Sequence, residues 1–169
     1  MNSMREVQVE KVVINIGVGE AGDKLLRAQK VLESLTGQKA IQTLSKTTNR
    51  DFGIREGMPI GAKVTLRHER ADKFLREAFY ARNNVLFRYN FDRQGNFSFG
   101  VADYTEFKGV KYDPDIGLFG MDVSVTLRRP GYRVARRRIR RHRIPRRHRT
   151  TPKEAIDYMI GRYEVEVKG

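Results

Sequence analysis

Apolar and polar residues alternate along several short segments of this chain, which is the pattern of half-buried β-strands. The clearest segment spans residues 6–17, where β-branched residues are frequent. Shorter segments of the same character lie at 39–44, 62–69, 97–103 and 121–127. The pattern therefore predicts a sheet made from these segments.

Three other segments repeat apolar residues at intervals of three or four, as an amphipathic helix does. They span 23–36, 71–82 and the region that begins at Thr151. The last one opens with Thr151, Pro152 and Glu154, which form a capping box with proline at the first helical position. Its predicted apolar face comprises Ala155, Ile156, Met159, Ile160 and Tyr163. This mixture of strands and helices predicts an α+β fold.

The segment 45–61 separates two predicted strands and is polar, with glycines and Pro59 spaced along it. It is too long for a simple hairpin turn, and long loops in compact domains are usually functional. We therefore treat it as a candidate functional element. Lys46, Arg50 and Arg55 at its rim can meet phosphate groups.

Positive charge is concentrated in one part of the chain. The 169 residues include 34 Lys and Arg against 20 Asp and Glu, a net charge of +14. Residues 128–149 hold 12 arginines and no acidic residue, so the rest of the chain carries only +2 (14 − 12). We therefore divide the chain into a near-neutral body at 1–127, a basic arm at 128–149 and a final helix at 150–169 that packs back on the body. The basic arm predicts a polyanionic partner.

The arm uses arginine, whose planar guanidinium binds phosphates in a bidentate manner and stacks on bases, and this favours RNA. A solvated tail is the alternative, but Val134, Ile139 and Ile144 interrupt the charges and a capped helix follows. Free in solution the arm is expected to repel itself, and to become ordered on RNA. The candidate phosphate-binding residues are Arg133, Arg136, Arg137, Arg138, Arg140, Arg141, Arg143, Arg146 and Arg147.

Other classes of function find little support in the composition. The chain has no cysteine, which excludes disulfides and cysteine-ligated zinc and suits an intracellular protein. His142 and His148 lie among arginines that would repel a metal cation, so no metal site is expected. No stretch approaches the roughly 18 apolar residues of a membrane span. No catalytic motif is present, and we expect no enzyme activity.

Residues 17–22 read Gly-Val-Gly-Glu-Ala-Gly between a predicted strand and a predicted helix, which is the context of a dinucleotide-binding fingerprint. Such folds also need an acidic residue at the end of the next strand to bind the ribose. Here the next strand ends at Leu44 and is followed by Ser45 and Lys46, with no acid between the strand and Asp51. A basic residue could suit a phosphorylated ribose, so an NADP-type oxidoreductase is kept as a minor alternative. The glycines are better interpreted as a tight turn from strand to helix, and no cofactor is expected.

Several longer stretches carry a specific resemblance. They include EKVVINIGVGEAG, LTGQKAIQTLSKTTNRDFGIREGMPIGAKVTLR, YTEFKGVKYDPDIGLFGMDVSVTLRRPGYRV and RRHRTTPKEAI. Over essentially its whole length the chain resembles the large-subunit ribosomal protein five family in its archaeal form. The resemblance implies an antiparallel sheet with helices packed on one face and a structural role in the cytoplasm, on the ribosome. An RNA- or DNA-binding factor outside the ribosome is the alternative within the binding class.

The resemblance also implies partners and contact residues. The partners are 5S rRNA, 23S rRNA, peptidyl-site tRNA and neighbouring proteins of the central protuberance. Carried over by position, the 5S rRNA contacts fall on Lys11, Asn15, Gln38 and Thr65. The loop at 45–61 corresponds to the element that reaches tRNA. The arm is absent from bacterial members, so its contacts cannot be inferred from them.

Overall fold

Five strands form one antiparallel sheet in the computed structural model, which describes residues 2–169. They are β1 (Gln8–Gly17), β2 (Ile41–Leu44), β3 (Pro59–Leu66), β5 (Phe97–Val101) and β6 (Met121–Arg128). Their spatial order is β2-β3-β1-β6-β5, so the long strand β1 lies at the centre between β3 and β6. The five strands predicted from alternation are all present, and the antiparallel sheet is confirmed.

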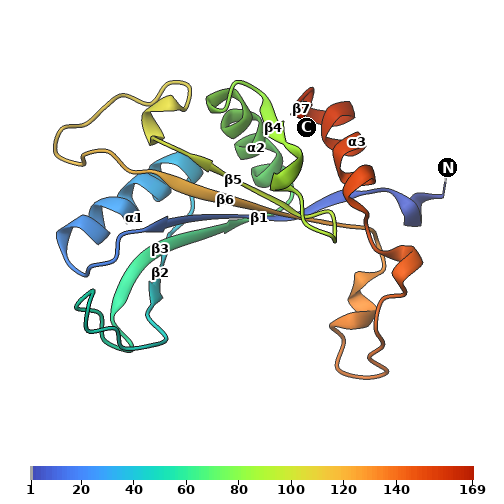
Figure 1. Ribbon diagram of the computed structural model, residues 1–169, viewed down its shortest axis with the longest axis horizontal. Coiled ribbons are helices and arrows are strands. Elements are labelled where there is room, and N and C mark those ends of the chain that lie inside the picture. Colours follow the sequence, from blue (N-terminus) through green and yellow to red (C-terminus); the bar gives the residue numbers. More distant parts are fainter. Residues whose placement is uncertain (1) are drawn as a thin grey trace.

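Three helices cover one face of this sheet, along its upper side in Figure 1. They are α1 (Asp23–Thr36), α2 (Glu69–Ala81) and α3 (Pro152–Tyr163). Alternate residues of the strands are buried beneath them, because successive side chains of a strand point to opposite faces. In β1 these residues are Val12, Ile14 and Ile16, and in β6 they are Met121, Val123, Val125 and Leu127. None of the three helices lies on the other face of the sheet.

The boundaries predicted for the strand at 62–69 and for the helix at 71–82 were wrong. The strand expected at 62–69 begins at Pro59 and ends at Leu66, and α2 begins at Glu69. Between them His68 has a φ of 55°, a left-handed conformation that ends the strand before the helix. The connecting loop is therefore residues 45–58 and not 45–61.

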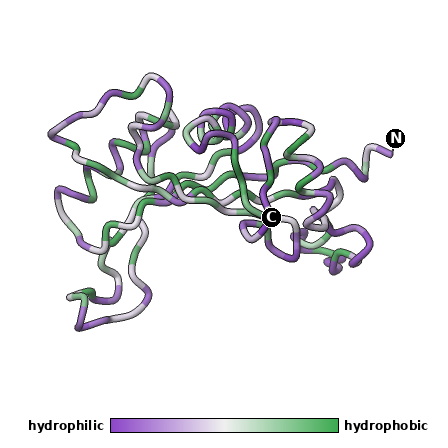
Figure 2. Tube along the Cα trace, turned by 45° about the horizontal axis from the view of Figure 1, so that its top comes forward, coloured by the Kyte–Doolittle hydropathy of each residue, from purple (hydrophilic) through white to green (hydrophobic). Residues whose placement is uncertain are grey.

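Aromatic side chains join the helical layer to the edge of the sheet. The ring of Phe79 in α2 lies 5.4 Å from that of Phe99 in β5 and 5.5 Å from that of Tyr163 in α3, centroid to centroid. Phe97 stacks between the same layers, 6.4 Å from Phe79. Such pairs each add about 0.5–1.5 kcal/mol beyond the area they bury. Figure 2 shows the hydrophobic colour running along the central strands, whereas the arm and the outer loops are mostly hydrophilic.

The capping box predicted for α3 is confirmed. The backbone N–H of Thr151 donates to Oε2 of Glu154 at 3.0 Å, and the Thr151 hydroxyl accepts from the Glu154 N–H. The predicted apolar face was only partly correct, because Ala155, Met159 and Tyr163 are buried whereas Ile160 is 48% exposed. Helix α3 is thus held to the body by one narrow stripe at a spacing of four residues.

Two short strands were not predicted. β4 (Val85–Phe87) and β7 (Glu166–Lys168) pair in parallel and form a separate two-stranded sheet. Three residues are too few for an alternating pattern to stand out in a sequence. Short 3-10 segments were missed for the same reason: η1 (Ser3–Arg5), η2 (Arg88–Asn90), η3 (Tyr104–Glu106), η4 (Tyr132–Ala135) and η5 (Arg146–His148).

The glycine-rich turn follows the end of β1. Gly19 and Gly22 have φ values of 81° and 119°, which favour glycine, and the N–H of Gly19 donates to the carbonyl of Ile60 at 2.8 Å. Strand β3 lies between β1 and β2. The two strands that flank α1 are therefore not neighbours, whereas a dinucleotide-binding unit has adjacent parallel strands there. The glycines shape a turn in a fold of a different kind.

The packing of the sheet predicts that alanine is tolerated at one of two strand glycines and destabilises the protein at the other. A Cβ atom at Gly61 in β3 would lie 2.8 Å from the Ile16 carbonyl oxygen and 2.8 Å from the Thr43 hydroxyl, whereas one at Gly100 in β5 meets nothing closer than 3.8 Å. We expect Gly61→Ala to lower the free energy of unfolding by about 1–3 kcal/mol, because neighbouring strands must shift. Gly100→Ala is the matched control and should stay near wild type in urea unfolding. Equal stability of the two variants would contradict this packing.

Candidate nucleic-acid interface

The helix-free face of the sheet presents a band of polar side chains. Lys11, Val13 and Asn15 of β1 point to this face, since they alternate with buried residues. Asn15 lies opposite Lys63 of β3 on one side and opposite Asp122 of β6 on the other. No helix of residues 2–169 covers the band. It is an open surface whose side chains can donate and accept hydrogen bonds.

The structure brings the four predicted 5S rRNA contacts close to this band. Lys11, Asn15 and Thr65 occupy the open face, and all three are half-buried. Gln38 belongs to the connection after α1, and its Nε2 donates to the backbone carbonyl of Thr65 at 3.3 Å. Sequence patterns could not indicate this bond, because the two residues lie far apart along the chain. Gln38 therefore extends the band to the edge of the sheet beside Thr65.

Lys63 was not singled out from the sequence. It is exposed and directly opposite Asn15 in the register of β1 and β3. Its position two residues before Thr65 places it on the same face, so alternation alone could have identified it. The band carries Lys11 and Lys63 against one acidic residue, Asp122, so its net charge is small. Binding there would depend on hydrogen-bond geometry more than on charge.

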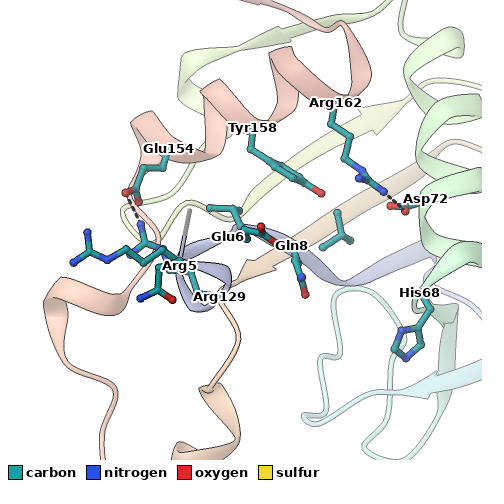
Figure 3. Close-up of a pocket in the computed structure, with 12 residues that line it drawn as sticks. Arg5, Glu6, Gln8, His68, Asp72, Arg129, Glu154, Tyr158 and Arg162 are labelled. Atoms are coloured by element: carbon teal, nitrogen blue, oxygen red, sulfur yellow. Dashed lines mark hydrogen bonds and ion pairs between the residues drawn. The ribbon is translucent and has the colours of Figure 1, made fainter.

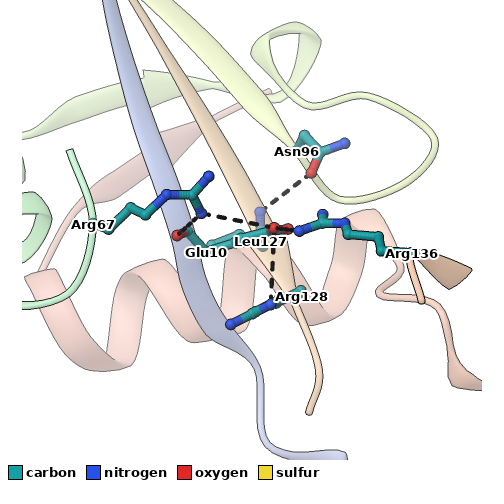
Figure 4. A network of polar contacts seen from close by, with 6 residues as sticks. All are labelled: Glu10, Arg67, Asn96, Leu127, Arg128 and Arg136. Carbon is teal, nitrogen blue, oxygen red and sulfur yellow. Dashed lines mark hydrogen bonds and ion pairs between the residues drawn. The ribbon is translucent and has the colours of Figure 1, made fainter. Parts of the chain in front are cut away.

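At one end of the band, three arginines surround a single buried glutamate (Figure 4). Glu10 is only 4% exposed and lies at a β-bulge, where the register of β1 against β6 shifts between Val9 and Lys11. Its Oε1 is 4.0 Å from Nη1 of Arg67 and 3.8 Å from Nη1 of Arg128, and it also forms an ion pair with Arg136. Arg136 belongs to the arm, so this cluster fastens the arm to the sheet.

The charge state of Glu10 follows from these contacts. Burial disfavours its ionised form, but the hydrogen bond and charge of Arg136 and the charge of Arg128 outweigh that effect and hold the pKa of Glu10 below its usual value. The same bond raises the pKa of Arg136. Both groups are therefore charged at neutral pH, and the cluster keeps an excess of positive charge.

A second carboxylate holds the start of the arm. Arg129 is buried and forms an ion pair with Glu154, the capping residue of α3. Burial opposes ionisation of Glu154, but its hydrogen bonds with Thr151 and the charge of Arg129 bring its pKa below the usual value. His148 also contacts the carbonyl of Pro130 at 2.9 Å, which brings the two ends of the arm together. The sequence did not indicate that Glu10 and Glu154 pair with arginines of the arm, because neither carboxylate lies in the arm.

Most of the arm arginines remain exposed around this framework. The predicted phosphate-binding residues, including Arg133 and Arg136, are all exposed. Arg137 donates to the carbonyl of Arg140 at 2.8 Å, a contact that gives the arm a local turn without neutralising any charge. The structure thus gathers many guanidinium groups on one protruding segment, at the right of Figure 1.

The loop 45–58 extends from the opposite end of the sheet (Figure 1). An antiparallel bridge between Asn49 and Ile54 narrows it to a tip where Phe52 is 75% exposed. Lys46, Arg50 and Arg55 are all exposed, as the sequence predicted for the rim of this loop. The loop is a hairpin extension of β2 and β3 with few buried residues.

A cleft of about 980 Å³ lies between the N-terminal segment, α2 and α3 (Figure 3). Several of its charged groups are paired: Arg162 contacts Asp72 at 2.8 Å, and the Tyr163 hydroxyl donates to the same carboxylate at 2.6 Å. Burial and Asp72 together raise the pKa of Tyr163 above its usual value. These groups hold α3 against α2. In the described chain, 2–169, no metal-binding group of three or more His, Cys, Asp or Glu occurs, and no helix is long and apolar enough to span a membrane.

The structure is that of an α+β protein with an open polar sheet face and an exposed basic arm, and comparison with known proteins identifies its class as ribosomal. Residues 2–55 match the family model for ribosomal protein L5, and residues 59–153 match the model for the C-terminus of the same ribosomal family. The large ribosomal subunit protein uL5 of Thermoplasma acidophilum is 54% identical over 168 residues, covering 99% of each chain. The same protein of Sulfurisphaera tokodaii is 48% identical, over 99% of this chain and 95% of its own.

The chain therefore belongs to the ribosomal protein L5 family. Members of this family are structural constituents of the large ribosomal subunit and are not enzymes. The resemblance identified from the sequence is confirmed, and the oxidoreductase alternative is set aside.

The ion pairs of Glu10 predict that removing its charge will destabilise the protein and loosen the arm. Glu10→Gln keeps the side-chain size and removes the charge that binds Arg136. We expect the free energy of unfolding to fall by about 1–2 kcal/mol, less than for a fully buried pair because the arginines regain water. Trypsin should also cleave the arm faster. Because the pKa of Glu10 is lowered on folding, the wild type should lose this contribution only as the pH falls below about 4.

Glu20→Gln is the matched control for this experiment. Glu20 forms an exposed ion pair with Lys24 at 3.1 Å, outside the cluster. Its loss should change neither stability nor trypsin cleavage measurably. If trypsin cleaves the arm of Glu10→Gln at the same rate as that of the wild type, the cluster does not hold the arm.

Proposed function

We propose that this protein binds 5S rRNA through the helix-free face of its sheet and helps to attach it to 23S rRNA in the central protuberance. The observation that carries the proposal is the polar band, which collects Lys11, Asn15 and Thr65 on one open face with Gln38 beside Thr65. Double-helical RNA presents a wide, shallow minor groove lined with 2′-hydroxyls, which a flat polar surface can approach. Amide and hydroxyl groups suit those contacts.

The arm supplies affinity and the band supplies selectivity in this proposal. The exposed arginines on the protruding segment can neutralise phosphates of any sequence and release counterions. The near-neutral band gains little from charge, so its hydrogen bonds discriminate between RNA shapes. We assign the arm to phosphates of the rRNA and the band to the 5S molecule.

The loop 45–58 contacts peptidyl-site tRNA in the same proposal. Its support is the family resemblance together with its form, a narrow hairpin that extends beyond the sheet and exposes Lys46, Arg50 and Arg55. Cations spaced along such a hairpin can contact a tRNA backbone without involving the rest of the fold.

The band predicts a loss of selectivity on mutation. In the triple variant Asn15→Ala, Gln38→Ala and Thr65→Ala, three sets of hydrogen bonds to RNA disappear. Each is worth about 0.5–1.5 kcal/mol, so the preference for 5S rRNA over a structured RNA of equal length should fall at least about tenfold. Filter binding at fixed salt measures both affinities. Gln29→Ala with Ser34→Ala on α1 is the control, and an unchanged preference in the triple variant would refute the assignment.

Shortening the loop should weaken tRNA binding without disturbing the fold. Replacing residues 46–57 by Asn-Gly leaves Ser45 and Met58 to close the hairpin, where the Ser45 N–H donates to the Met58 carbonyl at 2.8 Å. The thermal midpoint should stay within a few degrees, because few buried contacts are lost. Ribosomes that carry the variant should retain less peptidyl-site tRNA. A full-length loop with Lys46, Arg50 and Arg55 changed to Gln tests charge separately, and normal tRNA retention in both variants would refute the role.

The arm predicts a change in salt dependence. Arg137→Ala, Arg138→Ala and Arg141→Ala together should flatten the log–log salt slope of RNA binding by about 2–3, at roughly 0.7–0.9 per lost phosphate contact. All RNAs should weaken alike. Lysine at the same positions should keep the slope, because the charge is retained. It should lower the affinity somewhat, because lysine cannot form the bidentate contacts that arginine makes with phosphate. If the alanine variant keeps the wild-type slope, these arginines are solvated and bind no phosphate.

A further inference from the structure

Helix α3 has an apolar strip that its packing on the body leaves unused. Ala155, Met159 and Tyr163 face the core, whereas Ile156 and Ile160 lie one position further around the helix. Ile156 is half-buried and Ile160 is 48% exposed. Residues four positions apart are neighbours on the surface of a helix, so the two isoleucines form one continuous apolar strip.

This strip forms one wall of a groove of about 520 Å³, and β7 forms the other. The apolar lining consists of Pro152, Ile156 and Ile160 from α3 and Val167 from β7. Strand β7 pairs only with β4 among residues 2–169, so its second edge has no strand neighbour. The N–H of Glu166 donates to Asn84, just before β4, at 2.8 Å, so the backbone groups of the next residue, Val167, point away from β4.

The rim of the groove is positively charged. Arg88, Lys153 and Lys168 line it together with Gly169, and no acidic side chain does. Lys168 makes only a loose, exposed contact with Glu166 at 3.9 Å, which leaves its charge available. An aliphatic floor with a cationic rim is complementary to a ligand that has apolar side chains flanked by carboxylates.

We propose that this groove binds a short extended segment of another protein, in which aspartate or glutamate alternates with valine or isoleucine. Its apolar side chains would lie on Ile156, Ile160 and Val167, its carboxylates would meet the basic rim, and its backbone would pair with the free edge of β7. The floor has no aromatic face on which a base could stack and no amide or hydroxyl to read a base edge, which disfavours RNA as the occupant. The groove lies on α3, on the helical side of the sheet, so the segment and an RNA on the open face can bind together.

Fluorescence anisotropy with the full-length protein tests this proposal. The probe is a labelled seven-residue peptide that alternates glutamate with valine. A groove of this size predicts weak but saturable binding, because small interfaces give low affinity. The same peptide with lysine in place of glutamate should bind at least tenfold more weakly. A short duplex RNA should not displace the acidic peptide.

Two exposed residues give a matched pair of variants. Ile160→Ser removes one of the two isoleucines in the α3 wall of the groove, and Leu26→Ser on α1 changes a residue of similar exposure, 50%, elsewhere. Both should fold, since neither side chain is in the core, and only Ile160→Ser should weaken the peptide, by about fivefold or more. No saturable binding up to millimolar peptide, equal effects of the two variants, or displacement by RNA would each overturn the proposal.

Discussion

The fold depends on the alternation of side chains along β1: successive residues of this central strand point to opposite faces of the sheet, and the three helices cover only one of those faces. Val12, Ile14 and Ile16 occupy that buried face, and α1, α2 and α3 cover it. The intervening positions are therefore forced to the opposite side, where Lys11 and Asn15 stay within reach of a partner. The period of two, with polar residues at these positions and helices on one side only, leaves a polar, uncovered sheet face.

Charge imposes the second constraint. Twelve arginines in the arm cannot approach one another without anions, and the arm contains none. Two carboxylates from elsewhere, Glu10 and Glu154, pair with Arg136 and Arg129 and so fix where the arm leaves the body. The remaining guanidinium groups stay exposed. The protein thus neutralises enough charge to position the arm and leaves the rest available for a polyanion.

Elements with a clear periodic pattern were predictable, and contacts between distant segments were not. Patterns among residues close together in the sequence predict the five strands, the three helices and the Thr151 capping box. The place of Glu10 does not, because a bulge in β1 and arginines from three separate segments decide it. The same reason hid the Gln38–Thr65 bond and the outward position of Ile160. The candidate site residues rest on the resemblance, and alternation explains only why three of them share a face.

The central claim is that the helix-free face of the sheet lies against 5S rRNA. Because the chain has no cysteine, a single one can carry a tethered iron chelate that cleaves nearby RNA. Ser124→Cys puts the probe on the open face in β6, and Ser34→Cys puts it on α1, on the helical side. We expect the probe at 124 to cleave 5S rRNA at a few clustered nucleotides and the probe at 34 to leave it nearly intact. Cleavage from position 34 with none from position 124 would contradict the account.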